Sequence, residues 1–395
     1  MKTSFWAVVI AAAASISLAL GVRQTFGLFM LPLATEQGMA PALLGASIAL
    51  HNLVWGLAQP ISGALGDRYG AGRIIAFGGM CMALGLGLVA FAPGTVSVVL
   101  GIGVLTGLGV AGAGTGAVLA AVGRAVPSHR RGELIGLASA GGSLGQAAMV
   151  PFADQMITVW GATTAMAGLA FAALIIIPVA RTVEWRPSAA AARASAGLAG
   201  LPALARRALA DRDFALLTAG FFACGFQLAF LTVHLPSHLT LCGLPAMGAM
   251  ALMTIGLFNI PGSWLCGRAS DFIRPELVLG AIYLLRSITI AVFAATVPTE
   301  LGTIIFAAIM GFVWLGTIPL TNAAIARRFG MADLGALYGV CFLSHQIGGF
   351  LGAGSGALLL QYAGNYDVFW PVMVVVGISA TALNWMARPP AQVMA

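Results

Sequence analysis

The stretch GALGDRYGAGR, Gly63–Arg73, decides the architecture of this chain because it returns in weaker form as GRASDFIRPE, Gly267–Glu276. The shared positions are a glycine and a following aspartate: Gly63 and Asp67 in the first copy, Gly267 and Asp271 in the second. An arginine and two glycines recur at almost the same offset, as Arg124, Gly132 and Gly136 and again as Arg327, Gly335 and Gly339. A nearly constant offset across two separate loops predicts an internal repeat with two like-oriented halves.

The composition places both halves in a membrane. The 395 residues are 60% hydrophobic and only 8% charged, whereas a soluble domain carries about 25% charged residues. Apolar runs of about 20 residues each suffice to cross the bilayer as a helix. Twelve such runs occur, at residues 5–33, 42–65, 74–92, 97–123, 133–156, 161–180, 214–239, 247–267, 277–297, 301–326, 334–360 and 366–387. We therefore expect an all-α membrane protein with twelve transmembrane helices.

One long polar segment separates the sixth and seventh spans. It reads RTVEWRPSAAAARASAGLAGLPALARRALADRD and is rich in Ala and Arg. We interpret it as a cytoplasmic linker, part of which forms a helix along the membrane surface. The expected domains are an N-terminal six-helix half, 1–180, the linker, 181–213, and a C-terminal six-helix half, 214–395.

The basic residues predict the orientation. All but two of the 19 Lys and Arg residues lie in or beside the loops of one side, which is the positive-inside pattern. With an even number of spans, both termini are expected in the cytoplasm. The same distribution argues against nucleic acid as a partner, despite a net charge of +7. Five scattered cysteines and no metal-ligand motif give no reason to expect a metal or another cofactor.

GALGDRYGAGR resembles the cytoplasmic loop signature of the major facilitator superfamily, G-x-x-x-D-R-x-G-x-x-R, and it lies between spans two and three as that signature does. The resemblance covers nearly the whole chain and implies two parallel-repeat halves that rock about a central site. It also implies that spans 1, 4, 7 and 10 line the cavity, spans 2, 5, 8 and 11 flank it, and the others lie outside. The stretch SHQIGGFLGAGSGALLLQYAGNYD, Ser344–Asp367, is similar to a pattern in bacterial monocarboxylate and oxalate/formate-type permeases.

Charges at the cytoplasmic ends of the spans form a candidate gate. A carboxylate that ends a helix can pair with arginines at the same surface, and such a cluster must break when two halves rock. The alternative is that these charges only set the topology. The candidate gate residues are Asp67, Arg68, Arg73, Arg124 and Asp271.

Arg23 and Arg286 are the two basic residues within apolar segments. A charge at the bilayer centre costs about 2.5–3.5 kcal/mol on insertion scales, so both are functional candidates. Arg23 belongs to span 1, and we expect it to contact an anionic substrate with Gln24; the alternative is a bond to a neighbouring helix. Arg286 belongs to span 9, where we expect a structural contact with the gate or a loop carbonyl.

Further polar side chains recur on single faces of the expected helices. The candidate substrate-binding residues are Arg23, Gln24, His51, Asn52, Gln227, Asn259, Asn322, His345 and Gln346. The twelve acidic residues all fall in loops or near the ends of spans. A site with arginine, histidine and amides but without a central carboxylate favours a small organic anion over a cation.

The sequence therefore predicts a secondary active transporter of a small organic anion, a carboxylate, in a bacterial cytoplasmic membrane. It would act by alternating access as a symporter or antiporter, with protons or a counter-anion as coupling partner, and we expect a monomer surrounded by lipid. The alternative is a proton-coupled multidrug efflux pump for amphipathic compounds, because GLASAGGSLGQAAMVP, Gly136–Pro151, resembles a glycine-rich antiporter signature. No catalytic constellation occurs, so we do not expect an enzyme.

Overall fold

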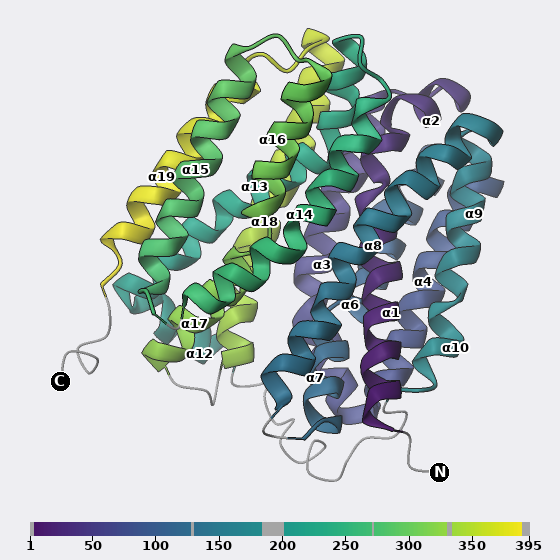
Figure 1. Ribbon diagram of the computed structural model, residues 1–395. Helices are drawn as coiled ribbons and strands as arrows, with labels where there is room; N and C mark the ends of the chain where they lie inside the picture. The colour runs from purple at the N-terminus through teal and green to yellow at the C-terminus, as the bar shows by residue number, and fades with distance from the viewer. Residues whose placement is uncertain (1–3, 128–129, 184–200, 271, 330–333, 389–395) are drawn as a thin grey trace. The chain divides into compact units, whose positions relative to one another are not determined.

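The computed structural model describes residues 4–127, 130–183, 201–270, 272–329 and 334–388, and helices form the regular structure of these segments (Figure 1). The chain divides into two compact units, Met1–Ala199 (unit 1) and Gly200–Ala395 (unit 2). The division falls inside the segment expected to be a linker. We describe each unit by itself.

Unit 1 has a helix at each of its six expected spans. The first span contains α1 (Phe5–Gln24), η1 (Phe26–Phe29) and α2 (Met30–Glu36), the second α3 (Pro41–Tyr69) and the third α4 (Ala71–Phe91). The fourth contains α5 (Thr95–Val98), the π-helical turn η2 (Val99–Leu105), α6 (Thr106–Ala113) and α7 (Gly116–Ala125). The fifth is α8 (Arg131–Trp160), and the sixth contains α9 (Ala162–Leu174) and α10 (Ile176–Ala180).

Unit 2 begins with a short helix, α12 (Leu201–Ala210), in the part of the expected linker that the structure describes. It packs against the first and fifth spans of its own unit. The spans that follow are α13 (Arg212–Leu241), α14 (Met247–Ala269), α15 (Pro275–Ala295), α16 (Glu300–Phe312) with α17 (Thr317–Phe329), α18 (Leu334–Ala363) and α19 (Phe369–Met386).

These helices confirm the expected all-α membrane architecture. Within the described residues, ten helical segments are long and apolar enough to cross a membrane. The helices α8 and α18, each of 30 residues, occupy the fifth and eleventh expected positions.

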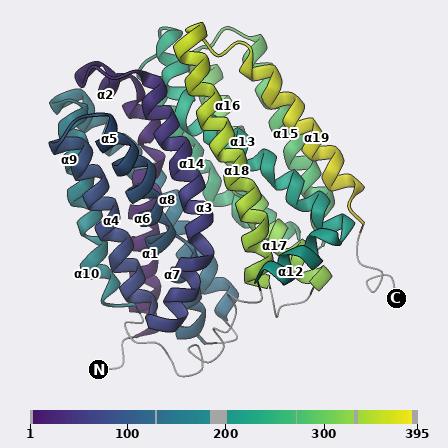
Figure 2. The same ribbon diagram turned by 180° about the vertical axis from the view of Figure 1, so that it is seen from behind.

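The same pairs of spans pack together in both units, which confirms the internal repeat. The first and fifth spans of a unit pair as α1 with α8 and as α13 with α18. The second and fourth pair as α3 with α6 and as α14 with α16. The third and sixth pair as α4 with α9 and as α15 with α19, which lie side by side when seen from the front and from behind (Figures 1 and 2).

Glycines allow the first and fifth spans to approach backbone to backbone. A Cβ atom on Gly145 of α8 would collide with the carbonyl oxygen of Ser17 in α1. In unit 2, a Cβ on Gly348 of α18 would collide with the carbonyl oxygen of Phe222 in α13. In lipid the hydrophobic effect does not drive helices together, because an apolar side chain is as stable against a lipid tail as against another helix. Close packing of helix backbones supplies the attraction instead. We name these two contacts the glycine seams.

Two glycines and one carboxylate define sharp turns in unit 1. Gly70, between α3 and α4, has φ 98°, and Gly161, between α8 and α9, has φ 84°, a backbone conformation that side chains with a Cβ rarely adopt. The carboxylate of Glu36 accepts hydrogen bonds from the main-chain N–H groups of Ala162 at 2.6 Å and Thr163 at 2.9 Å. It thereby caps the positive N-terminus of α9 and ties the sixth span to the first.

Spans 4 and 10 are interrupted near their middle, which the hydropathy pattern does not reveal. In unit 1, α6 ends at Ala113 and α7 begins at Gly116; in unit 2, α16 ends at Phe312 and α17 begins at Thr317. Each interruption leaves main-chain carbonyl groups without partners inside the helix. Irregular backbone at this depth is stable only where other protein groups bind it.

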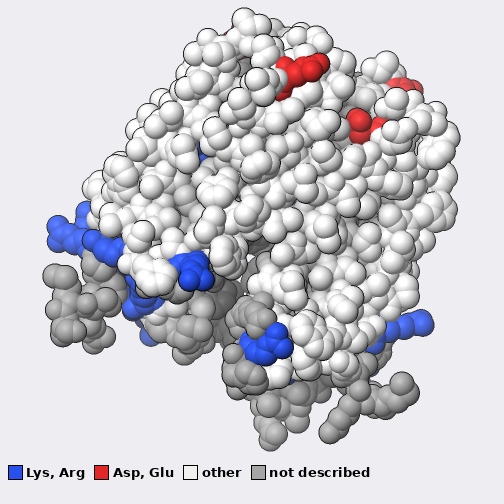
Figure 3. All heavy atoms as spheres, viewed as in Figure 1, with Lys and Arg blue, Asp and Glu red and all other residues white. Residues whose placement is uncertain are grey.

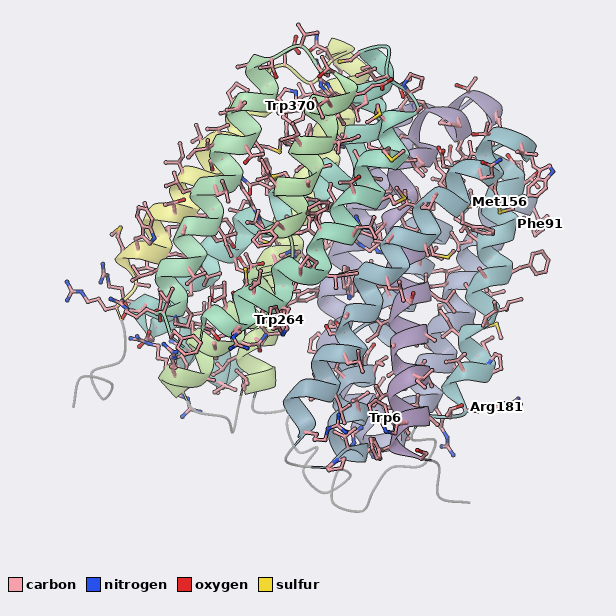
Figure 4. The ribbon with its side chains drawn as sticks, viewed as in Figure 1. Trp6, Phe91, Met156, Arg181, Trp264 and Trp370 are labelled. Carbon is pink, nitrogen blue, oxygen red and sulfur yellow. The ribbon has the colours of Figure 1, made fainter. Side chains whose placement is uncertain are left out.

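Charge is distributed unevenly along the helices. On the face seen in Figure 3, the visible Lys and Arg atoms lie mostly at one end of each unit and the visible Asp and Glu atoms at the opposite end. Asp211 and Asp213, which pair with Arg328, are acids at the basic end of unit 2. In unit 1, Trp6 and Arg181 lie at the basic end, and Phe91 and Met156 lie toward the other end (Figure 4). Tryptophan and basic side chains at one end of a bundle are typical of helices that cross a membrane.

Candidate functional site

Arg23 lies in the last turn of α1, just before the chain tightens into the short 3-10 helix η1. Its guanidinium group donates to the side-chain oxygen of Asn52 in α3 at 2.9 Å and to that of Gln24 at 3.1 Å. The Nε atom is buried without a hydrogen-bond partner. The side chain as a whole is partly exposed. Two of the three guanidinium nitrogens of Arg23 therefore bond to neutral amides, and the third, Nε, has no partner.

A chain of amides extends this contact across unit 1. Gln24 donates through Nε2 to the side-chain oxygen of Gln146 in α8 at 2.9 Å. Asn52 donates to the main-chain oxygen of Ile48 in its own helix at 3.2 Å. Gln24, Asn52 and Gln146 are all buried. Because the first, second and fifth spans each contribute one amide, the position of the guanidinium is determined by three helices.

An aromatic ring covers the guanidinium. The Cζ atom of Arg23 lies 5.1 Å from the ring centroid of Trp55, one turn after Asn52 in α3. The indole N–H of Trp55 donates to the side-chain oxygen of Gln59 at 2.6 Å. A cation over a tryptophan face is attracted by the ring quadrupole, and this attraction grows as water is removed.

His51 lies beside this group and is fully buried. Its Nδ1 atom is 2.9 Å from the hydroxyl of Thr106, at the start of α6. Its ring meets Phe26 edge-on at 5.6 Å between centroids and lies 6.3 Å from the centroid of Trp55. Its Nε2 atom has no hydrogen-bond partner.

No carboxylate compensates Arg23 within the part of unit 1 that the structure describes. The ion pairs recorded between described side chains, at Arg212, Arg274 and Arg328, do not include Arg23. The partners of Arg23 are neutral amides and an indole. The group can consequently hold an anion without first breaking an internal ion pair.

Arg286 has a different environment, in α15 of unit 2. It is fully buried, and its guanidinium donates to the main-chain oxygens of Val313 and Trp314. It also donates to the sulfur of Cys224 in α13 at 3.4 Å. Val313 and Trp314 form the interruption of span 10, so the positive charge caps the negative C-terminus of α16. Of the two structural contacts expected from the sequence, the gate or a loop carbonyl, the structure shows the bond to carbonyls.

Asn259 of α14 binds the same interruption from another direction. Its side-chain oxygen accepts from the main-chain N–H of Leu315 at 3.0 Å and from the hydroxyl of Ser263 at 2.9 Å. Cys224 also lies 3.3 Å from the hydroxyl of Thr317, at the start of α17. Three helices thus supply polar side chains to the interruption of span 10.

The other candidates in unit 2 are spread over several contacts. Gln227 donates to the main-chain oxygen of Met373 in α19 at 3.1 Å. His345 Nδ1 lies 3.0 Å from the side-chain oxygen of Gln346, and the imidazole stacks against Phe342 at 5.7 Å between centroids. Asn322 donates to the main-chain oxygen of Ile318 in its own helix at 3.0 Å.

The structure therefore groups the expected binding residues unevenly. It brings Arg23, Gln24 and Asn52 into one hydrogen-bonded network with His51 beside it. Gln146 and Thr106 complete this group and were not singled out from the sequence. Gln146 is an amide in the glycine-rich span GLASAGGSLGQAAMVP, and an amide among small residues in a membrane helix is the signal that could have identified it.

The candidate gate residues whose side chains the structure describes all belong to unit 1. Arg68, Arg73 and Arg124 are exposed, and the guanidinium of Arg68 lies 5.4 Å from the ring of Tyr69. The side chain of Asp67 and the whole of Asp271 lie outside the described residues. The gate stays a prediction.

A charged cluster that the sequence analysis did not single out lies at the basic end of unit 2. Arg328, at the end of α17, pairs with Asp211 at 2.6 Å and with Asp213 at 2.8 Å. Burial raises the pKa of Asp211, but the hydrogen bond and charge of Arg328 and the N–H of Phe214 lower this pKa below its ordinary value. Arg388 donates its main-chain N–H to Asp213 at 3.2 Å. The cluster ties the start of α13 to the ends of α17 and α19.

Two six-span repeats with interrupted helices and polar groups inside the spans define a membrane transporter fold. A family model of the Major Facilitator Superfamily matches residues 11–353. The chain belongs to this superfamily and is a multi-pass membrane transporter.

Relatives and solved structures agree with this assignment. The chain is 24% identical to the "Uncharacterized MFS-type transporter YcxA" of Bacillus subtilis, over 91% of this chain and 89% of that protein. It is 28% identical to "Monocarboxylate transporter 13" of Bos taurus, covering 93% and 85%, and 24% identical to the "Oxalate:formate antiporter" of Oxalobacter formigenes, covering 93% and 88%. The fold is similar to that of the xylose transporter XylE from E. coli, with a TM-score of 0.72, 15% identity and 98% of each chain covered.

Proposed function

We propose that this transporter carries a small organic anion, a carboxylate, by alternating access. The observation that supports the proposal is the state of Arg23: a partly exposed residue inside span 1 whose guanidinium is oriented by neutral amides and has no carboxylate partner in the described residues. An uncompensated cation inside a membrane protein is costly. It is stabilised when an anion arrives, and a planar guanidinium matches the two oxygens of a carboxylate.

The amide partners favour an anion as cargo for a second reason. Asn52, Gln24 and Gln146 orient the arginine without neutralising it, so unit 1 keeps a positive charge in its interior. The described acids of the helical spans lie near helix ends, as with Glu36 of α2 and Glu300 of α16. A carrier of cations needs a carboxylate deep within its spans.

The names of two relatives also favour a carboxylate as the substrate. One is named for monocarboxylates and another for oxalate and formate, and each aligns with more than nine-tenths of this chain. The two relatives are only 28% and 24% identical to this chain. The proposal of a carboxylate substrate therefore rests on Arg23 and its partners more than on these relatives.

A ligand screen tests the proposal on the purified full-length protein. We expect mono- and dicarboxylates such as acetate and oxalate to raise its unfolding temperature, and Arg23→Lys to abolish the shift, because lysine keeps the charge but loses the two-pronged geometry. Arg181→Lys, at an exposed arginine after α10, is the matched control and should keep the shift. A carboxylate shift that persists in Arg23→Lys contradicts the proposal. Stabilisation by cationic dyes alone would instead support the drug efflux pump.

We propose that the basic ends of the helices, and with them both termini, face the cytoplasm. The exposed thiol of Cys242 tests this orientation because it follows α13, which starts at the basic end of unit 2. A membrane-impermeant maleimide should label Cys242 from outside intact cells, and Cys242→Ser should remove the label. Labelling only after the cells are opened would reverse the orientation.

A further inference from the structure

His51 offers a second unpartnered polar atom next to Arg23. Its side chain is fully buried, and the Nε2 atom has no hydrogen-bond partner in the described residues. It precedes Asn52, whose side chain binds the guanidinium of Arg23. The imidazole and the guanidinium both flank Trp55, with centroid distances of 6.3 Å and 5.1 Å. A buried polar atom without a partner is uncommon in folded proteins and calls for a physical reason.

The contact with Thr106 determines which nitrogen of His51 carries the proton. The hydroxyl of Thr106 lies 2.5 Å from the main-chain oxygen of Ile102. A carbonyl oxygen can only accept, so the hydroxyl proton points to Ile102 and the lone pairs of the hydroxyl oxygen face His51. The Nδ1 atom of His51, 2.9 Å away, must then be the donor in the neutral ring. Its Nε2 is therefore an acceptor.

Arg23 and His51 thus present opposite requirements to one ligand. The free Nε–H of Arg23 is a charged donor, which suits a carboxylate. The Nε2 lone pair of His51 needs a group that donates a hydrogen bond. The rings of Phe26 and Trp55 lie against His51 and are apolar on these faces.

We propose that His51 selects a hydroxycarboxylate, with its Nε2 atom accepting a hydrogen bond from the hydroxyl of a substrate whose carboxylate binds Arg23. This inference rests on the proposed function. An oxo acid of the same length places a carbonyl oxygen against the Nε2 lone pair, and the two acceptors repel. A site whose buried groups match a hydroxyl rejects analogues that lack it, because its own polar atom is left unsatisfied.

Thr106 is a positioning residue in this arrangement. It does not contact the ligand and acts by fixing the tautomer of His51 through the bond to Nδ1. Valine has nearly the shape of threonine but cannot accept a hydrogen bond. In Thr106→Val the Nδ1 proton loses the hydroxyl that accepts it, so the preference for the Nδ1–H form weakens and the ring can place its proton on Nε2 instead.

Matched pairs of hydroxy and oxo acids test the inference on the purified full-length protein. The probes are 2-hydroxypropanoate against 2-oxopropanoate and 3-hydroxybutanoate against 3-oxobutanoate, with dissociation constants measured by calorimetry. We expect the hydroxy acid of at least one pair to bind about 10-fold more tightly than its oxo partner, since one unsatisfied buried group is worth roughly that factor. In Thr106→Val and in His51→Phe the ratio should fall to within about twofold.

The ratio is measured within one variant, so it is insensitive to changes in the amount of folded protein. Thr303→Val, at a fully buried threonine of α16 in unit 2, is the matched control and should keep the ratio of the parent protein. Equal affinities in the parent protein, or a ratio that survives in both Thr106→Val and His51→Phe, overturn the role of His51. If the hydroxy and oxo acids bind equally and Arg23→Lys removes binding, the proposed carboxylate transport is supported and only the proposed selectivity for a hydroxyl is wrong. If no acid binds the parent protein, the proposed function itself fails.

Discussion

Arg23 and Arg286 are both arginines inside apolar helices, yet they differ in burial and in the groups that they bind. Arg286 is fully buried, and its donors are directed to the main-chain oxygens of Val313 and Trp314 and to the sulfur of Cys224. Arg23 is partly exposed, and its donors meet side-chain amides or nothing. One charge binds the main-chain carbonyls of an interrupted helix, and the other is the residue that we propose to bind an anionic substrate.

The difference lies in what each partner can do without the arginine. Main-chain carbonyls at the end of α16 cannot move away and have no intrahelical donors, so they require Arg286 for stability. The amides of Asn52 and Gln24 can rotate to other partners. Stability should therefore depend on Arg286, and ligand binding should depend on Arg23.

The largest effect is expected from Arg286→Met, which keeps much of the side-chain volume but removes every donor. The free energy of unfolding should fall by about 3 kcal/mol, because hydrogen bonds to a charged group are worth about 1.5–3 kcal/mol and several are lost. Thermal unfolding in detergent measures this change, and Arg286→Lys should recover part of it. An unfolding temperature equal to that of the parent protein would show that the interruption of span 10 does not need the charge.

Arg23→Met makes the same substitution at the arginine of unit 1 and can be compared directly with Arg286→Met. The free energy of unfolding should change by only about 1 kcal/mol, because the lost bonds to amides are few and removal of an uncompensated cation is favourable. Binding of acetate or oxalate should nevertheless disappear. If Arg23→Met destabilises the protein as strongly as Arg286→Met, the two arginines are equivalent and the contrast is wrong.

Gln146→Leu tests whether the amide chain orients Arg23. Leucine fills a similar volume but cannot accept the bond from Gln24, so the carboxylate affinity should fall about fivefold, which corresponds to about 1 kcal/mol. Calorimetry on the variant measures this loss. Ser139→Ala, at an exposed serine earlier in the same helix, is a control expected to bind like the parent protein. Unchanged affinity in Gln146→Leu would remove α8 from the site.

The smallest effect concerns Arg328, an arginine that is paired with carboxylates. The pKa of Asp211 is lowered in the folded state, so its contribution to stability is present above the unfolded value of about 3.9 and is lost as the pH falls below it. Asp211→Asn keeps a residue that can cap α13 but removes the charge. It should cost about 0.5 kcal/mol at pH 7, because the pair is partly exposed. It should also flatten the loss of stability below about pH 4, as thermal unfolding at a series of pH values would reveal.

Much of the fold was predictable because its causes are local. Apolar runs, the positive-inside bias and the repeat around Asp67 and Asp271 each lie within a short stretch of sequence. The structure has a helix at every expected span. The interruptions of spans 4 and 10 were not predictable in this way, because they depend on side chains from other helices, such as Ser15, which donates to the main-chain oxygen of Ala113 at 2.9 Å, and Arg286.

The candidate site was predictable only in part for the same reason. A buried arginine with a neighbouring glutamine is visible in the sequence, and so are His51 and Asn52 on one turn of span 2. That Gln146 and Thr106 meet these residues depends on how α8 and α6 pack within unit 1. The candidates in unit 2, such as Gln227, show that a polar residue in a span can equally serve to bind a neighbouring backbone.

The glycine seams have a consequence for how this gene can vary. Every single-base change in a glycine codon that alters the residue adds at least a Cβ atom, and at Gly145 and Gly348 that atom would collide with a main-chain oxygen of the facing helix. No single-base change in these two codons therefore gives a residue that fits the contact. Sequence drift in natural populations should leave them untouched while the lipid-facing leucines around them exchange freely with other apolar residues.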